Sequence, residues 1–217
     1  MYFKDRKDAG IRLGEALVQY KNQDVIVYAL PRGGVVLGKE ISDQLQAPLD
    51  LVITKKIGHP MNPEYAICAV AEEGEPICNP NEISKVDPEW FQRELSRVRQ
   101  EIHRRRKEYL GDKPRRDPAG KIAIIVDDGI ATGFTMIAAI KEMKERNPKK
   151  VVVAIPVVPF DTAQKLRKMA DELIALDIDS NYLGGVGAYY EEFNQVEDSE
   201  VLELLRPEKN ESPGSED

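Results

Sequence analysis

The sequence predicts an α/β fold built on a doubly wound, mainly parallel β-sheet. Short runs of β-branched residues recur along the chain, separated by stretches in which apolar residues have helical spacing. Strands that alternate with helices in this way imply a parallel sheet covered by helices on both faces. The length of 217 residues fits one domain with a sizeable core.

The first quarter of the chain predicts one β-α-β unit. Apolar residues with helical spacing indicate an opening amphipathic helix over residues 8–20. The run VIVYAL (25–30) has the β-branched character of a buried parallel strand, and the tetrapeptide PRGG follows it at once. A helix is then expected over VVLGKEISDQLQ (35–46), followed by a second buried strand, LDLVIT (49–54).

Residues 55–86 differ in character from the rest of the chain. They are rich in Gly, Pro and Asn and contain one hairpin-like alternation, AVAEEGEPI, flanked by Cys68 and Cys78. A long stretch with little regular structure is more often a functional lid than a connector, so we expect a flexible loop here. The hairpin could place the two cysteines across from each other, but two are too few for a disulfide framework, and we expect reduced thiols.

The remaining chain resumes the alternation of helices and strands. Asp87 and Pro88 indicate the N-cap and first turn of a long polar helix that ends near Leu110. The later elements are expected as strand KIAIIV, helix TMIAAIKEMKER, strand KVVVAIPVV, helix DTAQKLRKMA, strand ELIAL, an irregular aromatic hood at about 177–197, and terminal helix DSEVLELLR. The expected organisation is a single domain over residues 1–206, followed by a polar, disordered tail over residues 207–217.

The composition argues against proteins that coat nucleic acid or anionic membranes. The formal net charge is -7 and the pI is near 5.1, whereas such proteins present a positive field. The basic run HRRRK (103–107) is expected to form part of a charged helix face interleaved with glutamates. The N-terminus is charged from residue 4, and no apolar run approaches the ~20 residues of a membrane span, so we expect a cytoplasmic protein.

The second half of the chain contains an acidic turn with the chemistry of a ribose phosphate site. Strand KIAIIV ends on Asp127 and Asp128, whose ionised carboxylates accept hydrogen bonds from hydroxyls or bind a divalent cation. The turn from Gly129 to Thr135 can aim backbone N–H groups at a phosphate, at the start of a helix whose dipole favours an anion. The alternative is that the aspartates only cap a turn.

The PRGG loop supplies the complementary chemistry for a second anionic group. Gly33 and Gly34 allow close approach of the backbone, while the Arg32 guanidinium offers fixed donors suited to pyrophosphate. Lys55 and Lys56 could add charge from the long loop, although both could equally be solvated, and Arg32 could form a surface salt bridge. Ligands of open parallel sheets bind at the carboxyl ends of the strands, so both loops are expected in one crevice if VIVYAL and KIAIIV are neighbours in the sheet.

Together, IIVDDGIATGFT and PRGG resemble the signature and the pyrophosphate loop of type I phosphoribosyltransferases. Within that family, the sequence is most similar to predicted members whose acceptor is unassigned. The resemblance implies Mg²⁺-dependent transfer of the 5-phosphoribosyl group from phosphoribosyl pyrophosphate (PRPP) to a nucleobase-like acceptor. It also implies a flexible loop at 55–86, a small C-terminal hood, and a non-proline cis peptide in PRGG. The implied PRPP-binding residues are Arg32, Gly33, Gly34, Lys55, Lys56, Asp127, Asp128, Gly129, Ile130, Ala131, Thr132, Gly133, Phe134 and Thr135, of which Arg32, Asp127 and Asp128 would also act in catalysis.

One position departs from the pattern of family members that act on 6-oxopurines. Those members have an acidic general base before the TG of the signature, where this chain has Ala131. A base would have to come from elsewhere, for example from Glu64, Glu72 or Glu73. In the hood, Tyr182 and Tyr189 are candidates for binding the acceptor, with Tyr190 and Phe193 as further aromatic residues.

Two other functional classes fit the same sequence. One is a non-catalytic regulator that senses PRPP or nucleotides, for which HRRRK is the only supporting feature. The other is an interaction subunit that keeps the fold without the site. The resemblance to the family favours a homodimer. It also implies that Mg²⁺ is held mainly through PRPP, so no protein metal ligands are assigned.

Overall fold

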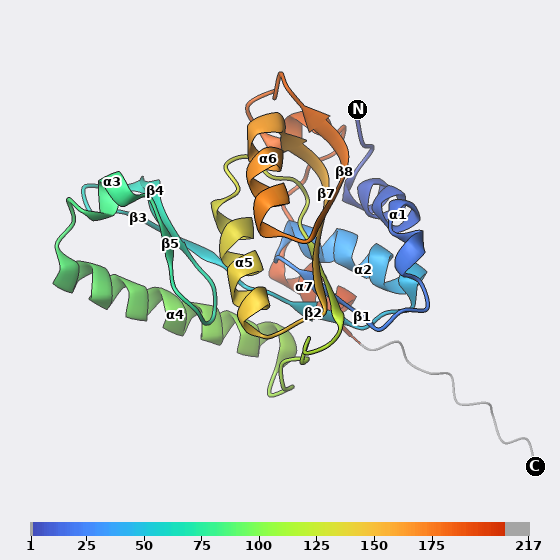
Figure 1. Cartoon of the computed structure of the whole chain (residues 1–217), viewed down its shortest axis with the longest axis horizontal. Coiled ribbons are helices and arrows are strands. Elements are labelled where there is room, and N and C mark those ends of the chain that lie inside the picture. The colour runs from blue at the N-terminus through green and yellow to red at the C-terminus, as the bar shows by residue number, and fades with distance from the viewer. Residues whose placement is uncertain (1, 207–217) are drawn as a thin grey trace, which may run out of the picture.

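The computed structural model describes residues 2–206 and confirms the α/β class. Its main sheet has five parallel strands in the order β2-β1-β6-β7-β8 (Figure 1). The strands are β1 (Val25–Ala29), β2 (Leu49–Leu51), β6 (Ile122–Val126), β7 (Lys150–Pro159) and β8 (Glu172–Asp179). The tail expected over residues 207–217 lies outside the described residues.

Helices cover both faces of this sheet, as the alternating sequence pattern predicts. Figure 1 shows α1 (Arg6–Ala16) and α2 (Gly33–Leu45) on one face, with α5 (Phe134–Glu145) and α6 (Phe160–Met169) on the other. Successive residues of β1 point to opposite faces, so Val27 packs in the core beneath α1 and α2 while Tyr28 packs in the core beneath α5 and α6. All five residues of β1 and of β6 are buried.

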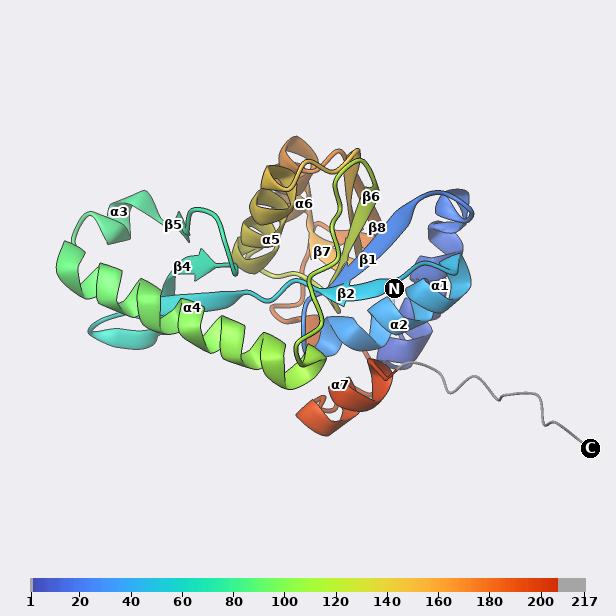
Figure 2. The same cartoon turned by 90° about the horizontal axis from the view of Figure 1, so that it is seen from below.

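The segment expected to have little regular structure contains an antiparallel sheet that leads into a long helix. Strands β3 (Lys55–His59), β4 (Asn62–Val70) and β5 (Ile77–Cys78) pair in that order, followed by α3 (Pro80–Ile83) and α4 (Pro88–Leu110). Figures 1 and 2 show this segment, residues 55–110, projecting to one side of the main sheet; we call it the arm. The strands were not expected because their apolar residues, such as Ile57 and Ile67, are buried together with Val98 and Ile102 of α4, far along the chain.

The expectation of two reduced thiols was wrong. Cys68 of β4 lies directly across from Cys78 of β5, and the two form a disulfide with an S–S distance of 2.04 Å. The cross-strand register produces this pairing, because it brings the two Cα atoms within 4.0 Å of each other. The sequence placed the cysteines at the two ends of a hairpin but offered no means of fixing the register.

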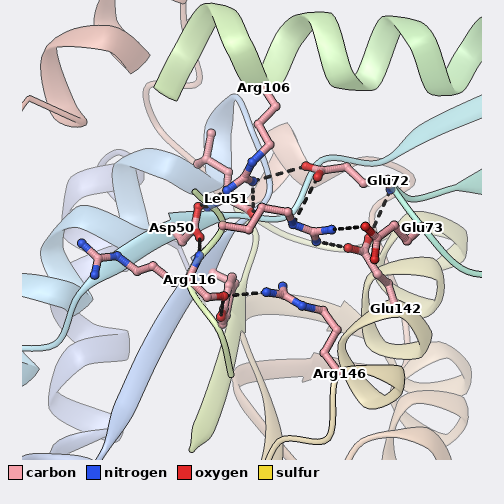
Figure 3. A network of polar contacts seen from close by, with 10 residues as sticks. Asp50, Leu51, Glu72, Glu73, Arg106, Arg116, Glu142 and Arg146 are labelled. Carbon is pink, nitrogen blue, oxygen red and sulfur yellow. Dashed lines mark hydrogen bonds and ion pairs between the residues drawn. The ribbon is translucent and has the colours of Figure 1, made fainter. Parts of the chain in front are cut away.

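A buried network of charges joins the arm to the main sheet (Figure 3). Arg106 of α4 donates to Asp50 of β2 at 2.8 Å and to Glu72 at 3.3 Å, and Glu72 also contacts Arg115 Nε at 3.2 Å. Arg115 in turn forms an ion pair with Glu142 of α5. Burial raises the pKa of Glu72, and the positive charges of Arg115 and Arg106 oppose this shift. We call these five residues the core–arm network.

Residues near both ends of the described chain pack against other elements of the fold. Phe3 N–H donates to the Tyr189 carbonyl at 2.8 Å, which joins the N-terminus to the hood, where η2 (Val186–Tyr189) lies. The opening helix begins at Arg6, two residues earlier than expected, because Asp5 accepts from Asp8 N–H and caps it. It ends at Ala16 and is followed by η1 (Val18–Tyr20). The last helix, α7 (Asp198–Leu204), lies beside α2 and α4 (Figure 2).

The charged face expected for α4 is confirmed, and its basic run is mostly paired. Arg104 forms an ion pair with Glu108, Arg97 contacts Glu94 at 2.6 Å, and Arg106 belongs to the core–arm network. Among residues 2–206, no helix is both long and apolar enough to cross a membrane.

Candidate active site

The PRGG loop and the acidic turn lie against each other at the carboxyl ends of adjacent strands. Strands β1 and β6 are paired in parallel, with Ala29 opposite Val126, so the loops that follow them leave the sheet side by side. A Cβ atom added to Gly33 would lie 2.0 Å from Asp128 Oδ2, and one added to Gly34 would lie 2.8 Å from the Val126 carbonyl oxygen. Both positions therefore require glycine for this contact.

The two aspartates occupy different environments within the acidic turn. Asp127 Oδ1 accepts from Asp128 N–H at 2.8 Å, and Asp128 Oδ2 accepts from Arg6 Nε at 2.8 Å. Burial raises the pKa of the Asp127 carboxyl well above its usual range, and the neighbouring charge of Asp128 adds to this effect. The positive charge of Arg6 therefore balances the Asp128 carboxylate, whereas burial disfavours the ionised form of Asp127.

Arg6 is a residue of this site that sequence reasoning missed. It lies at the start of α1, and its guanidinium carbon is 3.8 Å from the centre of the Phe193 ring. Its Nη1 also donates to the Asn194 carbonyl at 2.6 Å. Arg6 thus links the N-terminal helix, the hood and the acidic turn. No local pattern could have indicated a contact across 122 residues of sequence.

The turn after the aspartates leads into α5 without a side-chain cap. Gly133 adopts a positive φ of 80° at the N-cap position, and no side chain there accepts from the first helical N–H groups. The turn is held to β7 and α6 by two hydrogen bonds, from Ile130 N–H to the Val157 carbonyl and from Thr162 Oγ1 to the Ala131 carbonyl, each 3.0 Å long. Uncapped N–H groups in a fixed turn can bind an anion.

The PRGG loop has the corresponding arrangement at the start of α2. The Pro31–Arg32 peptide bond is cis, as the resemblance implied. Arg32 occupies the N-cap position of α2 with no side-chain hydrogen bond to the helix, and its Nη1 lies 3.9 Å from Asp198 Oδ1 of α7. Two uncapped helix N-termini therefore flank the paired carboxylates of Asp127 and Asp128.

Several candidates lie in the arm, and the structure gives them other partners. Lys55 forms an ion pair with Glu101 of α4, and Lys56 is exposed on β3. Glu72 is buried in the core–arm network, an arrangement that argues against it as a general base. Glu73 is exposed and contacts Arg115 at 3.4 Å, and Glu64 is exposed on β4. The structure brings none of these five residues into contact with the acidic turn.

The hood aromatics divide into packing residues and one residue with an unsatisfied hydroxyl. Tyr189 is 2% exposed, and its hydroxyl donates to Asp179 at 2.6 Å, so it acts as a packing residue. Tyr190 donates to the Asp128 carbonyl at 2.6 Å. Tyr182 stacks on Tyr189 with ring centres 5.3 Å apart, and its buried hydroxyl has no hydrogen-bond partner among residues 2–206. Burial raises the pKa of Tyr182, and the charge of Asp128 contributes.

Comparison with known proteins places the chain in a family. The profile described as phosphoribosyl transferase domain matches residues 4–192. A Mycobacterium tuberculosis (strain H37Rv) protein named "Putative phosphoribosyl transferase Rv0571c" is 36% identical over 205 residues, which are 94% of this chain and 46% of that protein. This chain therefore spans less than half the length of that relative.

A solved structure agrees in fold over almost the whole chain. The crystal structure of TT1426 from Thermus thermophilus is 38% identical in sequence and has a TM-score of 0.80. The match covers 94% of this chain and 98% of that protein. The two proteins are therefore similar in the arrangement of their helices and strands as well as in sequence. The family profile, the identity to these relatives and the adjoining PRGG and acidic loops lead to one conclusion: this chain belongs to the phosphoribosyltransferase family.

Proposed function

We propose that the protein transfers the 5-phosphoribosyl group of PRPP to a nucleobase-like acceptor and releases pyrophosphate. The observation that carries the proposal is the contact between the two loops, in which Gly33 lies against the Asp128 carboxylate. Two helix starts without side-chain caps, of the kind that can bind anions, flank two hydrogen-bond acceptors, and this order suits the phosphate, diol and pyrophosphate along PRPP.

Each part of PRPP then has a proposed partner. The backbone N–H groups and hydroxyls from Gly129 to Thr135 would bind the 5-phosphate, with Ile130, Ala131, Thr132, Gly133 and Phe134 forming the turn between them. Asp127 and Asp128 would accept hydrogen bonds from the 2- and 3-hydroxyls of the ribose. Arg32, Gly33 and Gly34 would bind the pyrophosphate, since a guanidinium beside exposed N–H groups suits that anion. The pairing of Lys55 with Glu101 makes Lys55 and Lys56 secondary in this scheme.

The chemistry follows from where charge develops during the transfer. The bond from ribose C1 to the pyrophosphate oxygen breaks, and its electron pair leaves with the pyrophosphate. A nitrogen of the acceptor forms the new bond to C1 and releases its proton. Positive charge grows on the ribose ring in between, and the carboxylates of Asp127 and Asp128 would stabilise it. Arg32 would stabilise the negative charge on the departing group.

The side chains at the site fit a Mg²⁺ ion that would be held mainly by PRPP and only to a small extent by the protein. Residues 2–206 contain no cluster of three or more His, Cys, Asp or Glu side chains able to hold a metal ion. Asp127 and Asp128 offer carboxylates in the acidic turn, and Arg6 already balances Asp128. When bound, Mg²⁺ would neutralise pyrophosphate charge, and its oxygen ligands would come mainly from PRPP.

The hood would receive the acceptor. Tyr182 presents an aromatic ring and a buried hydroxyl that has no hydrogen-bond partner among residues 2–206, so it is our candidate for contacting the acceptor. The packing role of Tyr189 makes that residue a support for Tyr182. We further propose a homodimer, which a sedimentation mass equal to that of one chain would contradict.

A pyrophosphate-release assay tests the proposed transfer. The purified protein is mixed with PRPP and Mg²⁺, and single purine and pyrimidine bases are added in turn. We expect pyrophosphate release with at least one base and its loss in Arg32→Ala, whereas Arg93→Ala, an exposed change on α4, should retain it. PRPP binding without release for any base would favour the alternative of a PRPP-sensing regulator.

A further inference from the structure

A cavity lies away from the candidate active site. Its volume is about 910 Å³, and it lies among α2, the end of α4, the connection from α4 to β6, and the end of α7. No residue of PRGG or of the turn from Asp127 to Thr135 lines it. A volume of this size falls within the range of ordinary small-molecule sites. We call this cavity the α2–α7 cleft.

Positive side chains dominate the α2–α7 cleft. Lys113, Arg116 and Arg206 line it, all three are exposed, and none forms an ion pair with another residue in the range 2–206. Its two carboxylates are already paired, because Asp43 accepts from Lys39 at 2.6 Å and Asp50 accepts from Arg106 at 2.8 Å. The remaining charge of the cleft is therefore positive, and an anion would find uncommitted donors there.

The backbone of Arg116 is fixed while its side chain is free. Its N–H donates to Asp50 at 2.8 Å, and its carbonyl accepts from the Tyr28 hydroxyl at 2.8 Å and from Arg146 at 2.5 Å. Figure 3 shows its guanidinium pointing away from the core–arm network with no marked contact. A donor on a fixed backbone loses less conformational freedom when it binds a ligand than a donor on a mobile loop.

The other wall of the α2–α7 cleft is apolar. Leu49, Leu110, Leu204 and Leu205 line it and are partly buried against the core. An inorganic anion would leave this wall in contact with water, whereas a ligand with an apolar or aromatic portion would cover it. The combination of a cationic rim and an apolar wall suits an organic phosphate the size of a nucleotide.

We infer that the α2–α7 cleft is a second ligand site, which binds a nucleotide-sized organic polyphosphate. Two elements connect it to the candidate active site. Helix α2 begins at Gly33 of the PRGG loop and carries Lys39 about 9 Å further along its axis. Helix α7 begins at Asp198, which faces Arg32, and ends at the cleft. A ligand in the cleft thus contacts both helices that border the PRGG loop.

Calorimetric titration with ATP, in the absence of Mg²⁺, tests this site in the whole chain. We expect binding that Arg116→Ala/Arg206→Ala weakens about a hundredfold, because each of the two lost guanidinium contacts to phosphate is worth about tenfold in affinity. The matched control Arg167→Ala/Lys168→Ala removes the same charge from exposed positions of α6 and should change affinity less than twofold. Asp128→Asn should also leave this binding unchanged within twofold.

The same titration has outcomes that would overturn the inference. Absence of ATP binding at millimolar concentration would remove the site. Equal loss of affinity in the cleft variant and in the α6 control would show that overall charge, rather than the cleft, determines ATP binding. Loss of binding in Asp128→Asn alone would assign ATP to the candidate active site. Inorganic tripolyphosphate is the second probe: we expect it to bind about tenfold more weakly than ATP, and equal affinity would refute the role of the apolar wall.

Discussion

The core–arm network makes a quantitative prediction about the free energy of unfolding. Arg106→Met removes the guanidinium but keeps much of the apolar stem that packs beside it. Three hydrogen bonds are lost, to the Leu51 carbonyl at 3.1 Å, to Glu72 at 3.3 Å and to Asp50 at 2.8 Å. The carboxylates of Asp50 and Glu72 are 4% and 1% exposed, so water cannot replace the lost partner.

We expect this change to lower the free energy of unfolding by about 3 to 5 kcal/mol at pH 7, the usual cost of leaving a buried charge without its partner. Asp50 keeps two backbone donors, Leu51 N–H at 2.7 Å and Arg116 N–H at 2.8 Å, which places the expected value toward the lower end. Urea denaturation followed by circular dichroism measures the loss. The matched control is Arg104→Met, which removes an exposed ion pair from the same helix and should cost about 0.5 kcal/mol or less.

The loss caused by Arg106→Met should also depend on pH. Burial already raises the pKa of Glu72, and removing a neighbouring positive charge raises it further. A group whose pKa is higher in the folded state than in the unfolded state contributes stability at low pH, and this contribution is lost as pH rises. The difference between wild type and variant should therefore be larger at pH 7 than at pH 5. A loss equal to that of Arg104→Met, with no dependence on pH, would refute the network as a support of the fold.

Three further predictions concern the active site and the arm. Gly33→Ala would place a Cβ atom 2.0 Å from Asp128 Oδ2 and should weaken PRPP binding at least tenfold by calorimetry, whereas Gly185→Ala, where nothing lies within 4 Å, should not. Asp127→Asn should be more stable than wild type at pH 8 but not at pH 4, because burial raises the pKa of Asp127 and its ionisation opposes folding as pH rises; equal stability in urea at pH 8 would contradict this. Reduction of the Cys68–Cys78 disulfide should lower the free energy of unfolding by about 2 to 3 kcal/mol, and a Cys68→Ser/Cys78→Ser variant should not respond to the reductant.

The sequence predicted the parts of the fold whose stability is encoded locally. Strand β1 and strand β6 were recognisable because β-branched runs of this length are typical of buried parallel strands. Helix α4 was placed with its observed bounds, since Asp87 and Pro88 are direct signals of a helix start. The contact between PRGG and the acidic turn also followed from the rule that ligands bind where parallel strands end.

The features that were missed depend on contacts between distant residues. The strands of the arm gain their burial from α4, so their composition alone resembled that of a loop. The pairing of Cys68 with Cys78 depends on a register that no short motif specifies. Arg6 reaches Asp128 across 122 residues, and the core–arm network combines residues from separate segments of the chain. Such contacts are set by the tertiary fold rather than by local propensity.

The most direct test of the proposed site is a calorimetric titration with PRPP, with and without Mg²⁺. The account predicts Mg²⁺-dependent binding to the wild type, weakened at least tenfold by Asp128→Asn and by Arg32→Ala and unchanged by Arg93→Ala, because the first two remove partners of the ribose and the pyrophosphate. Absence of binding to the wild type, or the same affinity in all four proteins, would contradict the assignment of the PRGG loop and the acidic turn as a PRPP site.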